Sequence, residues 1–135
     1  MESILLPIKQ EYANKIIKQT KLYEFRKKIG KKKVDKIVIY VTAPVKLVVA
    51  EVEVEAIISN SPLKLWEETS DYAGITKIEY MKYFKNKKIA FAYKLGKVTV
   101  YDKPKKLLDI GINYYPQSFV YLKNSNCDNC KFMIK

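Results

Sequence analysis

The sequence contains no histidine, one arginine and two cysteines among its 135 residues. The lack of histidine excludes every site that depends on imidazole, namely Ser-His-Asp and Cys-His nucleophiles, His-ligated zinc and imidazole acid-base relays. Two cysteines, Cys127 and Cys130, cannot form a disulfide framework, and their scarcity is typical of a reducing compartment. Any reaction must therefore use lysine, carboxylate, tyrosine, hydroxyl or thiol groups.

Long apolar runs are also missing. No stretch approaches the roughly 20 residues that span a bilayer, and the sequence opens with Met1, Glu2 and Ser3 in place of a basic region. We therefore expect a soluble, cytoplasmic protein without a membrane partner. Hydrophobic residues make up 48% of the chain, which suffices for the core of one domain. We place that domain at 1–122 and a C-terminal appendage at 123–135.

Charge is the strongest bias in the composition. Lysine and arginine number 26 and acidic residues 14, for a formal net charge of +12 at pH 7. Such a field attracts polyanions, nucleic acid among them. Arg26 is the single arginine, however, so paired guanidinium hydrogen bonds to a phosphate or base edge are available at one position only. Charge alone therefore does not identify the partner.

The spacing of apolar residues predicts an α+β fold. Helical spacing is found at 11–18, 61–69 and 76–84, the last with Ile78, Met81 and Phe84 as its buried stripe. Strands are predicted at 3–8, 23–26, 34–42, 45–58, 89–101 and 118–122, with a loop over 102–116. The order β-α-β-β-β-α-α-β-β, with mostly non-local strands, favours a small curled sheet or barrel with helices over its ends.

Lys21, Glu24 and Arg26 form the main polar constellation. Glu24 and Arg26 lie two residues apart in a predicted strand, so their side chains leave one face while Tyr23 and Phe25 enter the core. Lys21, in the preceding turn, is close enough to reach them. A carboxylate between two cations keeps its charged form, and the guanidinium offers paired donors to a carbonyl, phosphate or base edge. Spacing alone leaves two interpretations open, a surface ion pair and a polar pocket.

The residues around this constellation resemble the ASCH domain, a branch of the PUA-like superfamily with the signature G-x-K-x-x-E-x-R. Segments 8–17 and 21–26 carry the resemblance, which extends through 40–44, 95–97, 101–104 and 116–119. Gln19 replaces the signature glycine. The resemblance implies a PUA-like small mixed β-barrel whose cleft holds Lys21, Glu24 and Arg26. It also implies binding of RNA or modified nucleotides, with a role in RNA metabolism or transcription regulation.

Further ligand-binding residues are expected around this cleft. Lys9 and the Gln117-Ser118 loop are its expected neighbours, and exposed tyrosines offer platforms for base stacking. The tyrosines considered for this role are Tyr40, Tyr114 and Tyr115. A basic segment is expected to hold a phosphate backbone or, alternatively, to be a solvated loop or a set of edge lysines. That segment comprises Lys27, Lys28, Lys31, Lys32 and Lys33, with Lys36, Lys103, Lys105 and Lys106 later in the chain.

Two alternatives to simple binding stay open. One enzymatic branch of the ASCH family hydrolyses N4-acetylcytidine with a lysine, a threonine, a glutamate and an arginine, and Lys21 and Arg26 match that set. Glu24 occupies the threonine position, and Asp71 is only the nearest carboxylate to the missing glutamate. If the protein is an enzyme, Lys21 and Glu24 are the expected catalytic residues of an amidohydrolase or ribonuclease. We rank binding first because Glu24 should keep Lys21 charged. The second alternative is a protein-interaction module.

No metal or other cofactor is expected. Cys127 and Cys130 have the spacing of a zinc knuckle, but a structural zinc site needs four ligands and the chain lacks the other two. Glu51, Glu53 and Glu55 lie on one face of a predicted strand, where carboxylates usually pair with lysines of a neighbouring strand. The oligomeric state is left open by the sequence.

Overall fold

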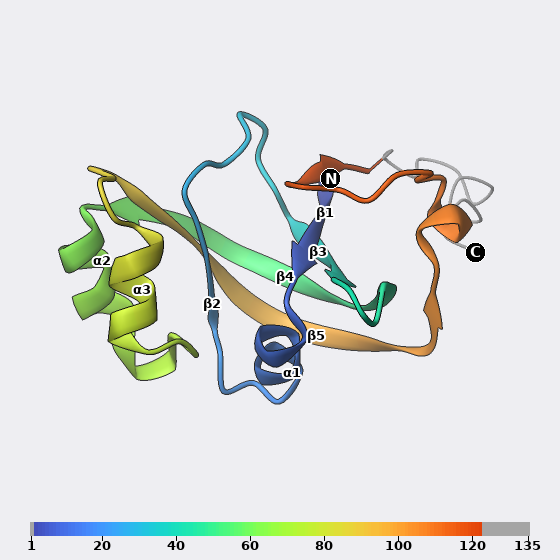
Figure 1. Ribbon diagram of the computed structural model, residues 1–135, viewed down its shortest axis with the longest axis horizontal. Helices are drawn as coiled ribbons and strands as arrows, with labels where there is room; N and C mark the ends of the chain where they lie inside the picture. The colour runs from blue at the N-terminus through green and yellow to red at the C-terminus, as the bar shows by residue number, and fades with distance from the viewer. Residues whose placement is uncertain (1, 123–135) are drawn as a thin grey trace.

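The computed structural model describes residues 2–122, and it consists of a curled six-stranded sheet with short helices at its ends (Figure 1). The α+β class and the predicted order of elements are confirmed. The strands are β1 (Ser3–Ile8), β2 (Tyr23–Arg26), β3 (Lys36–Val41), β4 (Leu47–Asn60), β5 (Ala90–Lys105) and β6 (Val120–Tyr121). The helices are α1 (Gln10–Ile17), α2 (Pro62–Thr69) and α3 (Lys77–Tyr83), with 3₁₀ turns η1 (Ser70–Tyr72) and η2 (Leu107–Ile110). The appendage at 123–135, with both cysteines, lies outside the described residues.

The sheet has the order β2-β5-β4-β3-β1-β6, so β2 and β6 are its edges. Strands β1 and β3 pair in parallel, and the other neighbours pair antiparallel. Both parallel strands are apolar almost throughout, as expected for strands that are covered on both faces. The long β4–β5 ribbon runs the length of the molecule and carries α2 and α3 at one end (Figure 1).

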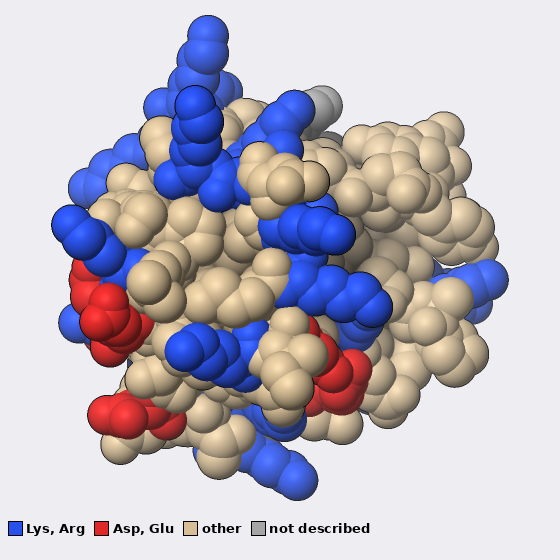
Figure 2. All heavy atoms as spheres, turned by 60° about the vertical axis from the view of Figure 1, so that its left-hand side comes forward, with Lys and Arg blue, Asp and Glu red and all other residues tan. Residues whose placement is uncertain are grey.

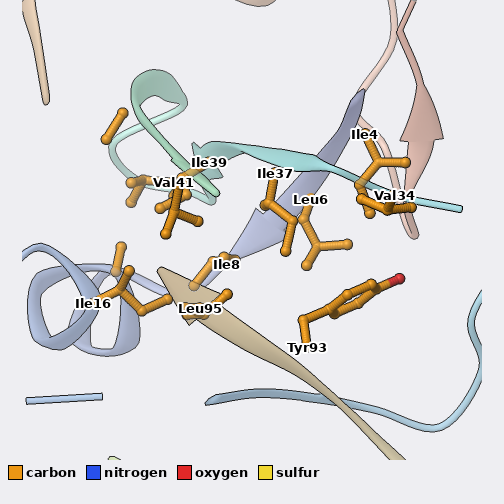
Figure 3. Packing of buried hydrophobic residues seen from close by; sticks show 13 residues of the cluster. Ile4, Leu6, Ile8, Ile16, Val34, Ile37, Ile39, Val41, Tyr93 and Leu95 are labelled. Carbon is orange, nitrogen blue, oxygen red and sulfur yellow. The ribbon is translucent and has the colours of Figure 1, made fainter. Parts of the chain in front are cut away.

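The main core fills the inside of the curl (Figure 3). Side chains alternate across a strand, so every second residue of β1 and β3 points into this core, and α1 closes it with Ala13 and Ile16. Strand β5 adds Tyr93 and Leu95. The inward residues of the two parallel strands are Ile4, Leu6, Ile8, Ile37, Ile39 and Val41.

Two smaller clusters cover the outer faces of the sheet. Leu5, Val38 and Tyr40 pack with the η2 region at one end, and Phe25 packs with helices α2 and α3 at the other. Helix α2 begins where the sequence predicts, with Ser61 as its cap and Pro62 in its first turn. This cap is typical of a helix start because the side chain satisfies a free backbone N–H.

Three details differ from the sequence prediction. Strand β5 continues to Lys105 because it pairs with β4 along most of its length, so the predicted loop over 102–116 begins as strand and contains η2. The last strand is limited to Val120–Tyr121. In α3, Ile78 is 82% exposed and Tyr80 is fully buried, because the face of the helix that packs against Phe25 carries Tyr80 and not Ile78.

Two of the three carboxylates of the acidic stripe of β4, Glu51 and Glu55, pair with lysine, as predicted. Lys36 of β3 lies 2.7 Å from Glu51, and Lys94 of β5 lies 3.9 Å from Glu55. Between residues 2 and 122, no helix has the length and apolar character needed to cross a bilayer.

Candidate functional site

Arg26 connects two strands that lie far apart in the order of the sheet. Its Nη2 donates to the Pro7 carbonyl of β1 at 2.9 Å and to Glu24 Oε2 at 2.8 Å. Strand β2 is one edge of the sheet and β1 lies next to the opposite edge. The curl therefore brings the start of the chain against the Glu24–Arg26 pair.

A cleft of about 510 Å³ opens at this junction. It holds Lys21, Glu24 and Arg26 together with Lys9, so the structure brings these four predicted residues into one place. Strands β1 and β2, the start of α1 and helix α3 form its walls. The other lining residues are Pro7, Ile8, Glu11, Tyr12, Phe25, Ile75, Glu79, Lys82 and Tyr83.

Lys21 forms part of the floor of the cleft and is only 2% exposed. Its amine donates to the Ala73 carbonyl at 2.6 Å and lies 4.9 Å and 5.3 Å from the ring centres of Phe25 and Tyr12. Its aliphatic stem packs against Gly74, where a Cβ atom would come within 2.5 Å of the Lys21 Cβ and Cγ. Gly74 also has a φ of +68°, a conformation that favours glycine. The segment before α3 therefore fixes Lys21.

Burial lowers the pKa of the Lys21 amine to about 8. Glu24 opposes this shift, while Lys15 and Arg26 add to it. Glu24 favours the charged form of Lys21, as the sequence predicts, but removal from water has the larger effect on the pKa because the ammonium is almost fully enclosed. At pH 7 about one tenth of such amines are neutral.

The Glu24–Arg26 pair keeps hydrogen-bonding capacity for a ligand. Both hydrogens of Arg26 Nη2 are used by Pro7 and Glu24. Within residues 2–122, Arg26 Nη1 and Glu24 Oε1 make no hydrogen bond, and Nε is a buried donor without a partner. A buried donor left unpaired costs about 1–3 kcal/mol. The pair thus leaves one donor, Arg26 Nη1, and one acceptor, Glu24 Oε1, unused by the described residues at the cleft, whereas Nε is enclosed by protein.

One wall of the cleft was not predicted from the sequence. Tyr12 of α1 donates its hydroxyl hydrogen to Glu79 of α3 at 2.8 Å, and burial followed by that carboxylate raises the pKa of Tyr12 well above its usual value. Lys82 and Tyr83 of α3 lie on the same wall. The signal was present, since residues 79, 82 and 83 share one face of the predicted helix.

Other predicted binding residues lie elsewhere. Tyr40 is buried in the cluster with η2 and does not line the cleft, and burial, followed by the nearby Tyr115, raises its pKa. Gln117 and Ser118 are exposed in the loop before β6 and are absent from the cleft lining. Their roles in ligand binding remain predictions.

The basic segment follows β2 directly and is exposed at each of its five predicted lysines. The Nζ atom of Lys27 lies 4.6 Å from the ring centre of Tyr83, a residue of the cleft. The Nζ atom of Lys32 lies 4.9 Å from the ring centre of Tyr121. Lysine and arginine outnumber acidic side chains on the face that Figure 2 shows. Among the described residues, no group of three carboxylates or thiols is arranged to hold a metal ion.

Comparison with known proteins reveals relatives that are similar in sequence and in structure. The family model described as "Domain of unknown function (DUF365)" matches residues 1–114. The crystal structure of ASCH from Zymomonas mobilis is similar over 90% of this chain and 87% of that chain, with 28% identity and a TM-score of 0.83. A tyrosine-to-phenylalanine variant of that protein gives a TM-score of 0.84 at 27% identity, over 91% of each chain.

Two longer proteins of Ureaplasma parvum serovar 3 contain a similar segment. ATP synthase subunit alpha is 34% identical over 123 residues, which are 90% of this chain and 15% of that protein. Large ribosomal subunit protein uL22 is 34% identical over 91 residues, 67% of this chain and 29% of that protein. The chain thus spans only a small part of these relatives. By its family match and its fold, it belongs to the DUF365 family and is an ASCH-domain protein.

Proposed function

We propose that the cleft binds one nucleotide unit of RNA, or a modified nucleotide, through the Glu24–Arg26 pair. The observation that supports this proposal is that Arg26 Nη1 and Glu24 Oε1 make no hydrogen bond among the described residues. Both side chains line the cleft of about 510 Å³. Ligand sites commonly have volumes of about 300–1,000 Å³ and a few converging polar groups. A base edge offers neighbouring donors and acceptors, which is the pattern that a guanidinium beside a carboxylate complements.

Charge beside the cleft supports an anionic ligand. The lining itself is nearly balanced, with Lys9, Lys21, Arg26 and Lys82 against Glu11, Glu24 and Glu79. The excess of positive charge comes from the exposed basic segment, whose Lys27 lies beside the cleft at Tyr83. The basic segment from Lys27 to Lys33 would then hold the phosphates of the flanking nucleotides. On single strands, each neutralised phosphate adds about −0.7 to the slope of the logarithm of the binding constant against the logarithm of the salt concentration.

The test is fluorescence anisotropy with labelled single-stranded RNA across a salt series, for the unmodified protein and Arg26→Lys. Arg26→Lys keeps the charge but removes the planar donors, so we expect binding to weaken at least about tenfold with little change in the salt slope. Lys97→Arg, a conservative change at an exposed position away from the cleft lining, is the control. Unchanged affinity and base preference in Arg26→Lys would refute the proposal, and absence of RNA binding at low salt would favour a protein-interaction module.

A hydrolase is the second function with a specific observation in its favour. Burial lowers the pKa of Lys21 to about 8, so about one tenth of the amines are neutral at pH 7 and can act as nucleophile or base. The test is incubation with N4-acetylcytidine and, separately, with RNA. Product that disappears in both Lys21→Ala and Glu24→Ala, with their folds retained, would establish catalysis. No product from either substrate would leave binding as the function of the cleft.

A further inference from the structure

A second hollow, of about 430 Å³, lies where the turn before β4 meets the η2 region. We call it the aromatic hollow and define it by Lys46, Lys106, Leu108, Asn113, Tyr114 and Tyr115, which are among its lining residues. Its described lining contains two lysines and no carboxylate. A site with this composition attracts a ligand in which an anionic group lies next to a flat, apolar ring.

The aromatic side chains of this hollow are exposed without being part of the core. Tyr114 and Tyr115 are 53% and 63% exposed, and Leu108 is 71% exposed. Lys46 places its amine over the Tyr115 ring, 5.0 Å from the ring centre, so a cation already lies against one face of this ring. Exposed rings next to basic side chains are the arrangement with which proteins bind single-stranded nucleic acid, because every base has a face that can stack.

The backbone links the hollow to the cleft. Ile8, at the cleft, accepts a hydrogen bond at its carbonyl from the Thr42 backbone N–H at 3.1 Å. Four residues after Thr42, the chain reaches Lys46 in the aromatic hollow. The end of β1 at the cleft is therefore hydrogen-bonded to the residue that follows β3, and the turn after that residue carries Lys46 of the hollow.

We propose that the aromatic hollow is a second nucleotide subsite for single-stranded RNA. Tyr115 stacks on a base, and Lys46 and Lys106 hold the neighbouring phosphate. This inference rests on the proposed function of the cleft and names the substrate class, since two subsites require an oligonucleotide where one would accept a free nucleotide. Recognition in the hollow is expected to be independent of sequence, because stacking does not read the edge of the base.

The test compares mononucleotides with RNA oligomers of two to eight nucleotides, for the unmodified protein, Tyr115→Ala and Lys46→Gln. We expect Tyr115→Ala to weaken binding of the longer oligomers by roughly fivefold to 100-fold, the loss of one stacked base, with mononucleotide binding unchanged. Tyr72→Ala and Lys97→Gln are matched controls, since both residues are exposed and neither lines the cleft or the hollow.

The outcomes separate the two proposals. If oligomer binding depends on Arg26 but is unchanged in both Tyr115→Ala and Lys46→Gln, the second subsite is overturned. The proposal for the cleft is then retained. Binding that depends on Tyr115 but not on Arg26 would overturn the cleft. Affinity that does not rise beyond one nucleotide would also overturn the second subsite, and absence of any RNA binding would overturn both.

Discussion

The cleft and the aromatic hollow use opposite designs. In the cleft, four basic and three acidic residues share one space, and Lys21 and Glu24 are buried while Arg26 is hydrogen-bonded to the backbone of another strand. In the hollow, the charged residues are two lysines, and the rings of Tyr114 and Tyr115 are open to solvent. Fixed polar groups of both charges suit recognition of one arrangement of donors and acceptors in a ligand. Exposed rings and lysines suit binding that does not distinguish one base from another.

The cleft and the hollow also differ in how much their side chains contribute to the stability of the fold. Lys21 is enclosed by Tyr12, Phe25 and the Ala73-Gly74 backbone, so a change in the cleft alters the packed interior. Tyr115 has no such enclosure. The cleft should therefore be sensitive in both stability and binding, and the hollow in binding alone.

The largest effect is expected at Gly74. In Gly74→Ala the new methyl group meets the stem of Lys21 and the residue must keep a positive φ, so we expect the free energy of unfolding to fall by about 2–5 kcal/mol. Gly111→Ala is the matched control, because Gly111 has a φ of +84° in an exposed turn and should lose only about 1–2 kcal/mol. Urea unfolding followed by Trp66 fluorescence measures both, and equal losses would contradict the enclosure of Lys21.

The next effect is a pH dependence caused by Lys21. Its pKa is about 8 in the folded protein, against 10.5 for an ordinary lysine, so between these values the unfolded chain binds more protons and stability rises with pH. We expect a gain of about 2 kcal/mol between pH 8 and 10 relative to Lys21→Met.

The pH range compared between the unmodified protein and Lys21→Met ends at 10, because burial raises the pKa values of Tyr80 and Tyr93 to about 12. Above pH 10 the unfolded chain loses tyrosine protons first, so stability falls with further increase in pH. Parallel pH profiles of the free energy of unfolding in the unmodified protein and Lys21→Met would show that Lys21 is not buried as described.

A smaller effect is expected from Glu24→Gln. The amide still accepts a hydrogen bond from Arg26 but no longer attracts Lys21, so we expect a loss of about 1 kcal/mol in stability and a further decrease in the pKa of Lys21. NMR titration of the lysine side chains measures that pKa. Glu55→Gln, in an exposed pair with Lys94, should change stability by less than about 0.5 kcal/mol. A rise in the pKa of Lys21 would contradict the described electrostatics.

The smallest effect on stability is expected in the aromatic hollow. Tyr115→Ala should change the free energy of unfolding by no more than about 0.5 kcal/mol, because the side chain is exposed and leaves no internal cavity. Thermal or urea unfolding checks this, alongside the RNA measurements described above. A loss above about 2 kcal/mol would show that the two regions do not differ in the way described.

Local periodicity predicted much of the fold and part of the site. The alternation through residues 23–26 placed Glu24 and Arg26 on one face, and their ion pair at 2.8 Å confirms it. The helix start at Ser61 and Pro62 also followed from local chemistry.

Long-range contacts account for what was missed. The burial of Lys21 depends on Ala73 and Gly74, about 50 residues away along the chain, and no local pattern reports that contact. For the same reason the sequence did not place Tyr12 against Glu79. Strand β5 was predicted too short because its pairing with β4 determines where it ends.

The central claim is that Glu24 and Arg26 face a ligand. Since Arg26 is the only arginine, the protein should give a single arginine Nε–H resonance in a nitrogen–proton correlation spectrum, from a donor that is buried and unpaired among the described residues. We predict that this resonance shifts and saturates as mononucleotides or short RNA are added. A resonance that does not move while RNA is shown to be bound would contradict the claim.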